Sequence, residues 1–471
     1  MLTLAHFLES LSTYQATGDE PVVSCVVMDS REAVPGSLFV AHKGEKVDGH
    51  AFVAAAFAQG AIAALVDRPI PGDYATIDLR TTLPPSLPLS ASTPVCLVVE
   101  ETITALQTSA KAWRARFPVE VIGITGSVGK TSTKELTHAV LSSRYRTFKS
   151  PGNRNSILGL PLALFDLQDS HEKAVLEMGM YTTGEIATLC DMTSPKVGVV
   201  TLVGAVHLER AGSMENIVKA KRELVEALPA DGTAVLNKDD ALVMSMADHT
   251  QARVFTYGLD KKADLWASHI RSKGLEGVRF TLHHEGESMV VQVPLLGRHS
   301  VHTALRAAAV GLVEGLTWDE IMHGLRNTAV QLRLVTVPGP KNSLIIDDTY
   351  NASPDSVLAA LNLMHDLDGR SVAVLGDMLE LGYLEEAGHR QVGRRAAEVA
   401  KLLITVGRRA RWIGEEAMAS GLPADKVVMV DDAVTAVATL EELIEEKDTV
   451  LVKGSLGMRM DQIINAIGRY S

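Results

Sequence analysis

Short apolar runs alternate with amphipathic helical patterns over most of the chain. In its middle part the apolar runs are VEVIGITG, AVLEMG, VGVVTLVG, TAVLN and RVFTYG, and stretches with helical spacing separate them. Continuous apolar runs of this length are typical of parallel strands that are buried on both faces of a sheet. The pattern therefore predicts an α/β fold with a parallel sheet in this part of the chain.

The same alternation starts again after a Pro-Gly-Pro break at residues 338–340. The later runs are SLIIDD, SVAVLGD, LLITVG, KVVMV and TVLVKG, and each is followed by a helical pattern. Earlier in the chain, a Pro- and Ser-rich stretch at residues 81–94 closes a first block, either as a linker or as a surface loop. We therefore expect three α/β domains, the last of them doubly wound and Rossmann-like. They cover residues 1–105, 106–331 and 332–471.

Composition narrows the class of protein further. The chain has 471 residues, of which 46% are hydrophobic and 22% charged, and its formal net charge is −12. The length suits about three domains of roughly 150 residues each. A net acidic chain with only 4% aromatic residues is a poor partner for nucleic acid. An anionic ligand must therefore be held locally, by backbone N–H groups, a few basic side chains or metal ions.

The cysteines and the N-terminus indicate the cellular compartment in which the protein is expected. Cys25, Cys96 and Cys190 have no CxxC spacing, which argues against a disulfide framework or a zinc knuckle. The N-terminus lacks the pattern of a signal peptide, and the most apolar stretch, residues 51–66, is better explained by a buried helix followed by a strand than by a membrane span. We expect a soluble cytoplasmic protein with no membrane span. The sequence leaves the oligomeric state open, and a monomer is the working expectation.

The clearest candidate for chemistry lies where the strand at residues 119–125 meets a glycine-rich loop and a helical pattern. Glycines let backbone N–H groups surround a phosphate, Lys130 would reach the β- and γ-phosphates, and the Thr131 hydroxyl would bind Mg²⁺. The usual P-loop pattern has a glycine at the position of Ile124, so this loop is a variant. The residues expected at the nucleotide phosphates are Thr125, Gly126, Ser127, Val128, Gly129, Lys130, Thr131 and Ser132.

Residues 125–131, TGSVGKT, resemble the T-G-x-x-G-K-[ST] loop of the Mur ligase family, which are ATP-dependent amino-acid ligases of peptidoglycan synthesis. Further segments similar to that family follow in order over nearly the whole chain. The resemblance implies that the first domain binds a uridine-nucleotide substrate, the central domain binds ATP, and the third domain binds the acceptor. It also implies two Mg²⁺ ions as cofactors.

Two segments resemble the metal-binding regions of the family. Glu177 ends the apolar strand AVLEMG and by resemblance binds Mg²⁺, whereas residues 180–183 depart from the family pattern and receive no role. By the same resemblance His207 would bind a second Mg²⁺, and Lys221 would be carbamylated. An ammonium about 4 Å from a dication costs about 8 kcal/mol at an effective dielectric of 20, whereas deprotonating a lysine at pH 7 costs only about 4.6 kcal/mol. The expected metal ligands are Thr131, Glu177, His207 and Lys221, and the expected catalytic residues are Lys130, His207 and Lys221.

Other candidate positions concern the nucleotides. Asn237 lies in an N-x-D-D segment, a pattern that also forms a turn without any function. Arg333 and Asp348 are aligned with residues that lie near the ATP phosphates in the family. Ser300 and Thr303 replace the two asparagines of a family motif, so the adenine contacts are left open.

The first domain has its own candidates in Asp29-Ser30-Arg31. This segment resembles the uridine-nucleotide-binding part of the family, so Ser30 and Arg31 are expected contacts for the uridine nucleotide. Arginine offers a planar fork that suits phosphate oxygens. A turn stabilised by Asp29 would also explain the segment.

The segment at residues 347–356, DDTYNASPDS, points to the acceptor. It resembles the family member that adds D-alanyl-D-alanine to UDP-N-acetylmuramoyl-tripeptide, and Tyr350 and Asn351 are then the expected acceptor contacts. Ser353 followed by Pro354 is also a good helix start, so part of the segment can serve as a cap. The resemblance implies ATP, UDP-N-acetylmuramoyl-tripeptide and D-alanyl-D-alanine as substrates.

Alternatives to this ligase remain. A related ligase that forms the tripeptide is disfavoured by the Tyr350-Asn351 segment. A P-loop GTPase or kinase is disfavoured by Ile124 and by the lack of an N-K-x-D motif. A catalytically inactive nucleotide-binding protein is disfavoured because Lys130, Glu177, His207 and Lys221 are all present. The sequence does not decide whether the third tripeptide residue is diaminopimelate or lysine.

Overall fold

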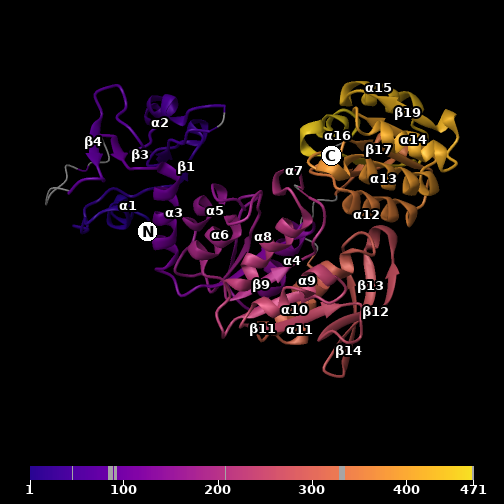
Figure 1. Ribbon diagram of the computed structural model, residues 1–471, viewed down its shortest axis with the longest axis horizontal. Coiled ribbons are helices and arrows are strands. Elements are labelled where there is room, and N and C mark those ends of the chain that lie inside the picture. The colour runs from indigo at the N-terminus through magenta and orange to yellow at the C-terminus, as the bar shows by residue number, and fades with distance from the viewer. Residues whose placement is uncertain (45, 83–88, 90–92, 207, 328–334, 469–471) are drawn as a thin grey trace. The chain divides into compact units, whose positions relative to one another are not determined.

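The structure is a computed structural model (Figure 1). It describes residues 1–44, 46–82, 89, 93–206, 208–327 and 335–468. The chain forms two compact units, and each is described by itself. The first unit consists of residues 1–123, 145–179 and 185–195, and the second of residues 124–144, 180–184 and 196–471.

The N-terminal part forms a parallel five-stranded sheet with the strand order β1-β2-β3-β5-β4. Every residue of β2, β3 and β5 is buried, as expected for continuous apolar strands. Within residues 51–66 the strand is fully buried, but the helix before it buries only Val53 and Ala56. The strands are β1 (Val26–Val27), β2 (Leu38–Val40), β3 (Ala63–Val66), β4 (Ala75–Asp78) and β5 (Val95–Val98), and the helices are α1 (Leu4–Leu11), α2 (Val53–Ala58) and α3 (Thr102–Arg114).

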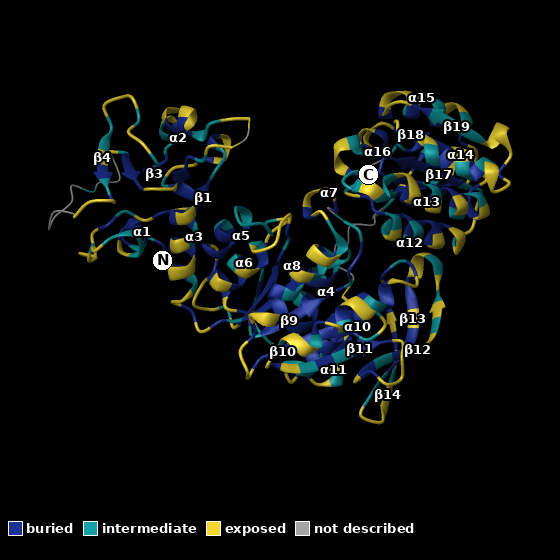
Figure 2. Cartoon of the chain, viewed as in Figure 1, coloured by how far each residue is buried: buried dark blue, intermediate teal, exposed yellow. Residues whose placement is uncertain are grey.

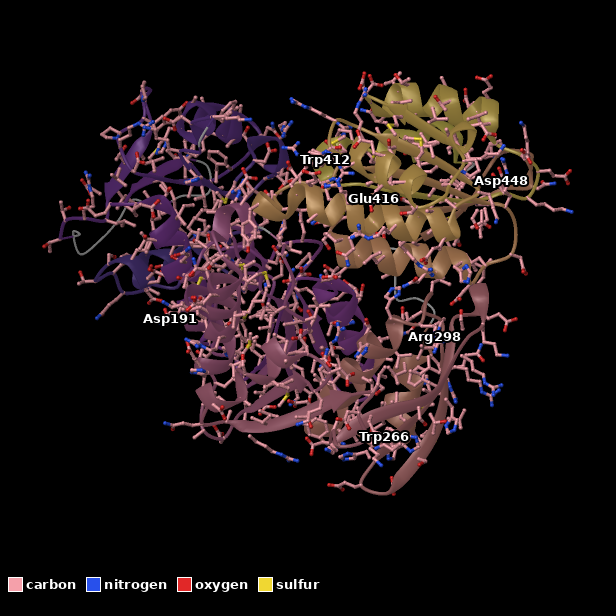
Figure 3. All side chains as sticks on the ribbon, turned by 45° about the vertical axis from the view of Figure 1, so that its right-hand side comes forward. Asp191, Trp266, Arg298, Trp412, Glu416 and Asp448 are labelled. Atoms are coloured by element: carbon pink, nitrogen blue, oxygen red, sulfur yellow. The ribbon has the colours of Figure 1, made fainter. Side chains whose placement is uncertain are left out.

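The central sheet has nine strands in the order β14-β13-β12-β11-β10-β9-β6-β8-β7. Strands β9 to β12 pair in parallel, whereas β12, β13 and β14 pair antiparallel, an extension that the sequence pattern did not predict. In this extension Trp266, which is labelled in Figure 3, lies on β12, one of the antiparallel strands. Its ring stacks on that of His283, with ring centroids 3.8 Å apart. The strands are β6 (Glu120–Thr125), β7 (Thr147–Lys149), β8 (Lys173–Glu177), β9 (Val197–Val200), β10 (Thr233–Asn237), β11 (Arg253–Gly258), β12 (Leu265–Ser272), β13 (Val278–His284) and β14 (Glu287–Val293).

Helices connect the strands of the central sheet. The predicted helix start at Lys130 is confirmed, because α4 begins there, directly after the glycine-rich loop. Helix α10 packs against α4. The helices are α4 (Lys130–Leu141), α5 (Gly159–Leu164), α6 (Glu185–Thr193), α7 (Leu208–Ala211), α8 (Met214–Glu226), α9 (Ala241–Met244), α10 (Ser300–Val313) and α11 (Trp318–Leu325).

The C-terminal part has a six-stranded sheet with the order β15-β16-β20-β17-β18-β19, parallel except for β15. Two separate apolar cores, one around Leu361 and Leu403 and one around Ile404 and Ile463, accompany this sheet, as in a doubly wound domain. The strands are β15 (Val335–Pro338), β16 (Leu344–Asp348), β17 (Ser371–Gly376), β18 (Leu402–Val406), β19 (Val427–Val430) and β20 (Thr449–Lys453). The helices are α12 (Pro354–His365), α13 (Glu385–Val399), α14 (Arg411–Ala419), α15 (Ala433–Leu443) and α16 (Asp461–Ile467).

The burial pattern confirms the predicted α/β class with three parallel-sheet domains. Figure 2 shows buried residues concentrated in the strands and exposed residues on the outer sides of the helices. In the described parts of the chain, every helix is too short or too polar to cross a bilayer. Cys96 and Cys190 are buried and Cys25 is half-buried, all three as free thiols, and burial raises the pKa of Cys96 to about 11.

Candidate active site

The glycine-rich loop connects β6 to α4 and lies in the second unit. Gly129 caps α4 with φ +83°, and Gly126 has φ +144°, both in the region that favours glycine. A Cβ on Gly126 would overlap the Thr201 hydroxyl. Glycine is therefore required at residue 126 both for the backbone conformation and for the close approach of Thr201, which follows β9.

The segment that follows β9, residues 201–204, holds this loop in place, and we call it the loop clamp. The Ser127 N–H donates to the Leu202 carbonyl at 2.8 Å, and the Ser127 hydroxyl donates to the Gly204 carbonyl at 2.9 Å. The Thr201 hydroxyl donates to the Val128 carbonyl at 2.7 Å. The side chain of Ser127, predicted to contact phosphate, thus bonds to the clamp.

The other predicted phosphate contacts gather at the same place. Lys130 Nζ donates to the Gly126 carbonyl at 2.9 Å, so the ammonium lies over the loop. Thr131 and Ser132 are half-buried in the first turn of α4, and Thr125 is buried at the end of β6. A strand end, a glycine loop, a lysine and a helix N-terminus together form a site for a phosphate group.

Lys221 lies in α8 and is only 4% exposed. Burial lowers the pKa of this lysine well below its usual value, and the charge of Lys130 lowers it further. No ion pair to Lys221 is present among the described residues. Burial and the charge of Lys130 therefore both disfavour the ammonium form of Lys221.

Glu177 belongs to the first unit, where it ends β8 and is 1% exposed. The Asn155 side-chain amide donates to Glu177 Oε1 at 2.7 Å, and the Glu177 N–H donates to the Ser150 hydroxyl at 3.2 Å. A neighbouring amide that orients a carboxylate is a common arrangement around metal ligands. No local pattern indicated Asn155 or Ser150, because their contacts with Glu177 are long-range.

Two predicted site residues, His207 and Arg333, lie outside the described residues. Among the described residues, no group of three His, Cys, Asp or Glu side chains could hold a metal ion. The Thr131 hydroxyl in the second unit and the Glu177 carboxylate in the first unit are each an oxygen donor. Oxygen donors of this kind suit Mg²⁺.

The turn after β10 is confirmed as a turn. Asn237 is buried, and its side-chain oxygen accepts a hydrogen bond from the Asp239 N–H at 3.1 Å. Asp240 caps α9 and also accepts a hydrogen bond from the Val203 N–H, in the loop clamp, at 3.0 Å. The carboxylate of Asp240 therefore links this turn to the phosphate loop through the clamp, a contact that the sequence did not reveal.

The first turn of α10 contains the two positions where asparagines are replaced. Ser300 and Thr303 are buried, and the Ser300 hydroxyl donates to the Leu296 carbonyl at 2.6 Å. Between them, His302 Nε2 lies 3.8 Å from an Asp239 carboxylate oxygen. Burial, together with the charge of Arg306, lowers the pKa of His302 to about 4. At neutral pH His302 therefore presents a neutral imidazole beside the turn.

The predicted acceptor segment follows β16. Lys453, which is buried, donates from Nζ to Asp348 Oδ2 at 2.7 Å and to the Asn351 carbonyl at 2.8 Å. The Asn351 side chain is exposed and accepts a hydrogen bond from the Ala352 N–H at 2.9 Å, and Tyr350 is half-buried. Lys453 thus anchors the segment, and in this structure Asp348 bonds to it.

The helix start predicted at Ser353-Pro354 is confirmed. Ser353 and Ser356 form a capping box, and Pro354 occupies the first turn of α12. Beside this start lies a hollow of about 310 Å³. Asp355 lines it from α12, and Arg394 lines it from α13. The hollow therefore offers an acidic and a basic side chain next to the acceptor segment.

The predicted uridine-nucleotide contacts lie in a short 3-10 turn at residues 30–32. Arg31 is exposed and forms a bidentate pair with Asp29, and Arg31 lowers the pKa of Asp29 to about 2 through these hydrogen bonds. The Asp29 side chain also caps the turn by accepting from the Arg31 N–H at 2.9 Å, while Ser30 is buried. A stabilised turn accounts for these contacts, and the nucleotide role stays a prediction.

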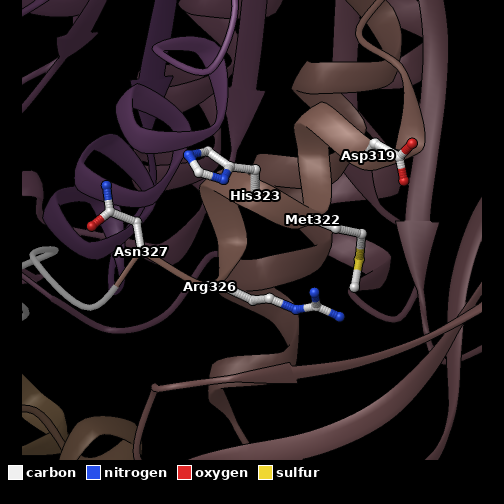
Figure 4. Close-up of a pocket in the computed structure, with 5 residues that line it drawn as sticks. All are labelled: Asp319, Met322, His323, Arg326 and Asn327. Atoms are coloured by element: carbon white, nitrogen blue, oxygen red, sulfur yellow. The ribbon is translucent and has the colours of Figure 1, made fainter.

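An open hollow of about 500 Å³ lies at the end of α11 (Figure 4). None of the predicted site residues lines it. Its lining includes one acidic side chain, Asp319, and one arginine, Arg326. The lining residues are Asp319, Met322, His323, Arg326 and Asn327.

A variant P-loop at the end of a parallel strand defines an α/β nucleotide-binding protein. Comparison with known families gives the same order of domains. Residues 22–75 match the Mur ligase family catalytic domain, residues 124–311 the Mur ligase middle domain, and residues 332–456 the Mur ligase glutamate ligase domain.

Individual relatives align nearly end to end. The UDP-N-acetylmuramoyl-tripeptide–D-alanyl-D-alanine ligase of Bacillus subtilis is 35% identical over 95% of this chain and 93% of its own. The Escherichia coli ligase of the same name is 35% identical over 99% and 98%. A crystal structure of MurF from Acinetobacter baumannii has a TM-score of 0.84 at 29% identity and covers 98% of both chains. The chain belongs to the Mur ligase family and is an ATP-dependent, ADP-forming ligase.

Proposed function

We propose that this ligase joins D-alanyl-D-alanine to UDP-N-acetylmuramoyl-tripeptide in the cytoplasmic synthesis of peptidoglycan precursors. The relatives from Bacillus subtilis and Escherichia coli are named for this reaction. The structural observation that carries the proposal is the phosphate loop with the charge of Lys130 acting on buried Lys221. That pair suits chemistry at a phosphate group.

The reaction proceeds in two steps. The terminal carboxylate of the tripeptide attacks the γ-phosphorus of ATP, the bond to the β-phosphate oxygen breaks, and an acyl phosphate and ADP form. The amine of D-alanyl-D-alanine then attacks the acyl carbon and loses a proton, and phosphate leaves the tetrahedral intermediate. Lys130 and the N-terminus of α4 stabilise the negative charge that develops on the transferred phosphoryl group.

Two Mg²⁺ ions are part of the proposal. Bound Mg²⁺ would neutralise phosphate charge. The lowered pKa of Lys221 supports carbamylation, in which the neutral amine adds CO₂ and releases a proton to give an anionic carbamate. The buried, oriented carboxylate of Glu177 supports its role. The proposed ligands are Thr131, Glu177, His207 and carbamylated Lys221.

The substrate contacts follow the three domains, for which we propose the bounds 1–105, 106–331 and 332–471. The hollow beside α12 is lined by polar side chains, among them Asp355, Gln391 and Arg394, which suit the polar groups of a dipeptide. We therefore place the acceptor next to the segment that contains Tyr350 and Asn351. The other proposed contacts are Ser30 and Arg31 for the uridine nucleotide, and Asn237, Arg333 and Asp348 for ATP.

The test is phosphate release with ATP and a single acceptor at a time: D-alanyl-D-alanine, D-alanine, L-lysine, diaminopimelate or glutamate. With UDP-N-acetylmuramoyl-tripeptide as donor, we expect turnover with the dipeptide alone, because a pocket built for an internal amide leaves polar groups unpaired when that amide is missing. Asn351→Ala should reduce this turnover at least tenfold. Lys130→Ala serves as the control without phosphate transfer.

Two outcomes would contradict the proposal. Turnover with a free amino acid that equals the turnover with D-alanyl-D-alanine would show that the enzyme is not specific for the dipeptide. Turnover only with the dipeptide donor, UDP-N-acetylmuramoyl-dipeptide, would identify the enzyme as the tripeptide-forming ligase.

A further inference from the structure

A buried arginine lies behind the phosphate loop. Arg306 is on α10 and is 4% exposed. No ion pair neutralises its guanidinium in the part of the chain that the structure describes, and Nε has no hydrogen-bond partner there. A buried charge without a counter-charge is unfavourable. An anion bound near Arg306 would therefore stabilise its buried charge.

The contacts of Arg306 lead directly to the phosphate loop. Its Nη1 donates to the Thr133 hydroxyl at 2.7 Å, and this hydroxyl donates in turn to the Gly129 carbonyl at 2.7 Å. A Cβ placed on Gly129 would lie 2.9 Å from Nη1. The guanidinium thus touches the last residue of the loop and the first turn of α4.

This position gives Arg306 two effects on a bound phosphate. The bond through Thr133 fixes the turn in which Lys130 and Thr131 stand. The positive charge also lies behind the N-terminus of α4, where it adds to the positive end of the helix dipole. Both effects favour an anion in front of the loop, and the second grows with the charge of that anion.

We propose that Arg306 is a positioning residue that increases the affinity of this ligase for ATP. Its positive charge lies behind the N-terminus of α4, and its hydrogen bond to Thr133 fixes the first turn of that helix. The ligand class is a nucleoside polyphosphate, and its phosphates supply the counter-charge that the described residues do not provide. Arg306 does not contact the acceptor segment, so the effect is specific to the nucleotide.

The test compares three substitutions. Arg306→Met removes the positive charge but keeps a long side chain, and Arg306→Lys retains the charge. Thr133→Val removes only the hydroxyl that links Arg306 to the Gly129 carbonyl. Titration calorimetry gives the Kd of a non-hydrolysable ATP analogue, ADP and AMP, and kinetics give KM for each substrate. Arg298→Met is the matched control, because it removes an exposed positive charge just before the same helix (Figure 3).

We expect Arg306→Met to raise the Kd of the ATP analogue at least tenfold. The Kd of ADP should rise less, and the Kd of AMP should rise no more than twofold. KM for the dipeptide and for the uridine nucleotide should stay within twofold. Arg306→Lys should recover most of the affinity, Thr133→Val should cost about threefold, and Arg298→Met should have no effect.

Several results would overturn the proposal. One is an ATP affinity within twofold of the wild type in Arg306→Met. Another is an equal loss of affinity for AMP and for the ATP analogue, which would mean that the substitution only disorders the phosphate loop. If Arg306→Met does not fold, Arg306→Gln, which also removes the charge, takes its place under the same two criteria. Loss of dipeptide specificity in the acceptor test would leave this inference unaffected.

Discussion

At the scale of single residues, three basic side chains lie at or near the phosphate loop in a chain whose net charge is −12. Lys130 donates to the Gly126 carbonyl of the loop, and Arg306 lies behind the loop. Lys221 is close enough to Lys130 for that charge to lower the pKa of Lys221. This repulsion disfavours the ammonium form of Lys221, whereas the carbamate that we propose there would carry a negative charge. Its role is therefore open to a direct test.

Lys221→Ala should lower ligation at least a hundredfold and recover partly with a short carboxylate such as acetate or formate, which can take the place of the carbamate. Phosphate release measures both effects. Carbon-13 NMR with labelled bicarbonate should show a carbamate signal that is absent from the variant. Lys219→Ala is the matched control, because Lys219 is exposed on the same helix. A wild-type enzyme that is fully active but shows no carbamate signal would exclude the modification.

At the scale of elements, the contact between the phosphate loop and the loop clamp is the feature most sensitive to volume. Gly126→Ala should reduce ATP turnover at least a hundredfold, because its Cβ overlaps Thr201 and displaces the loop by about an ångström. Gly286→Ala is the control. Gly286 also has a positive φ, +83°, but nothing lies within 4 Å of its Cβ position.

The control variant should lose at most about 1 kcal/mol of unfolding free energy and keep its activity. Steady-state kinetics and urea unfolding measure the two quantities for both variants. Comparable activity losses in the two variants would show that backbone strain, not the clash with Thr201, determines the effect.

Local sequence patterns predicted the elements that carry the site but not the contacts between them. Strand β6, the glycine loop and the start of α4 were predictable because apolar runs, glycines and helix caps act over a few residues. The antiparallel strands β12 to β14 were missed, since their polar–apolar alternation lacks the continuous apolar run that marked the other strands.

The partners of the site residues were missed for a different reason. Thr201, Asn155 and Lys453 act on the site from positions that only the tertiary structure brings near. Arg306 was missed because an arginine in an apolar helix has no local signature of function. Two predicted residues, His207 and Arg333, lie outside the described residues, so their roles stay predictions.

At the scale of the whole molecule, the apolar cores are separate. One core lies in the N-terminal sheet around Phe39, another around Leu236 in the central part, and two more accompany the C-terminal sheet. Separate cores unfold as separate cooperative units unless their interfaces are large. Thermal unfolding should therefore involve more than one transition.

Differential scanning calorimetry tests this expectation. We expect a calorimetric enthalpy larger than the van't Hoff enthalpy, which is the sign of more than one unit. A non-hydrolysable ATP analogue at about 100 times its Kd should stabilise the domain that binds it by about 2.7 kcal/mol, which raises its transition by about 5–10 °C. The other transitions should stay in place. A single two-state transition that shifts as a whole would contradict this picture.

The different environments of the three free thiols have a practical consequence. Thiol reagents attack the thiolate, and the raised pKa of Cys96 and the burial of Cys190 suppress that form or block access to it. Cys25, which is half-buried near β1, is left as the natural attachment point for a maleimide dye. A fluorophore placed there would follow the N-terminal domain during a catalytic cycle in the unmodified sequence, with no cysteine to remove or to introduce.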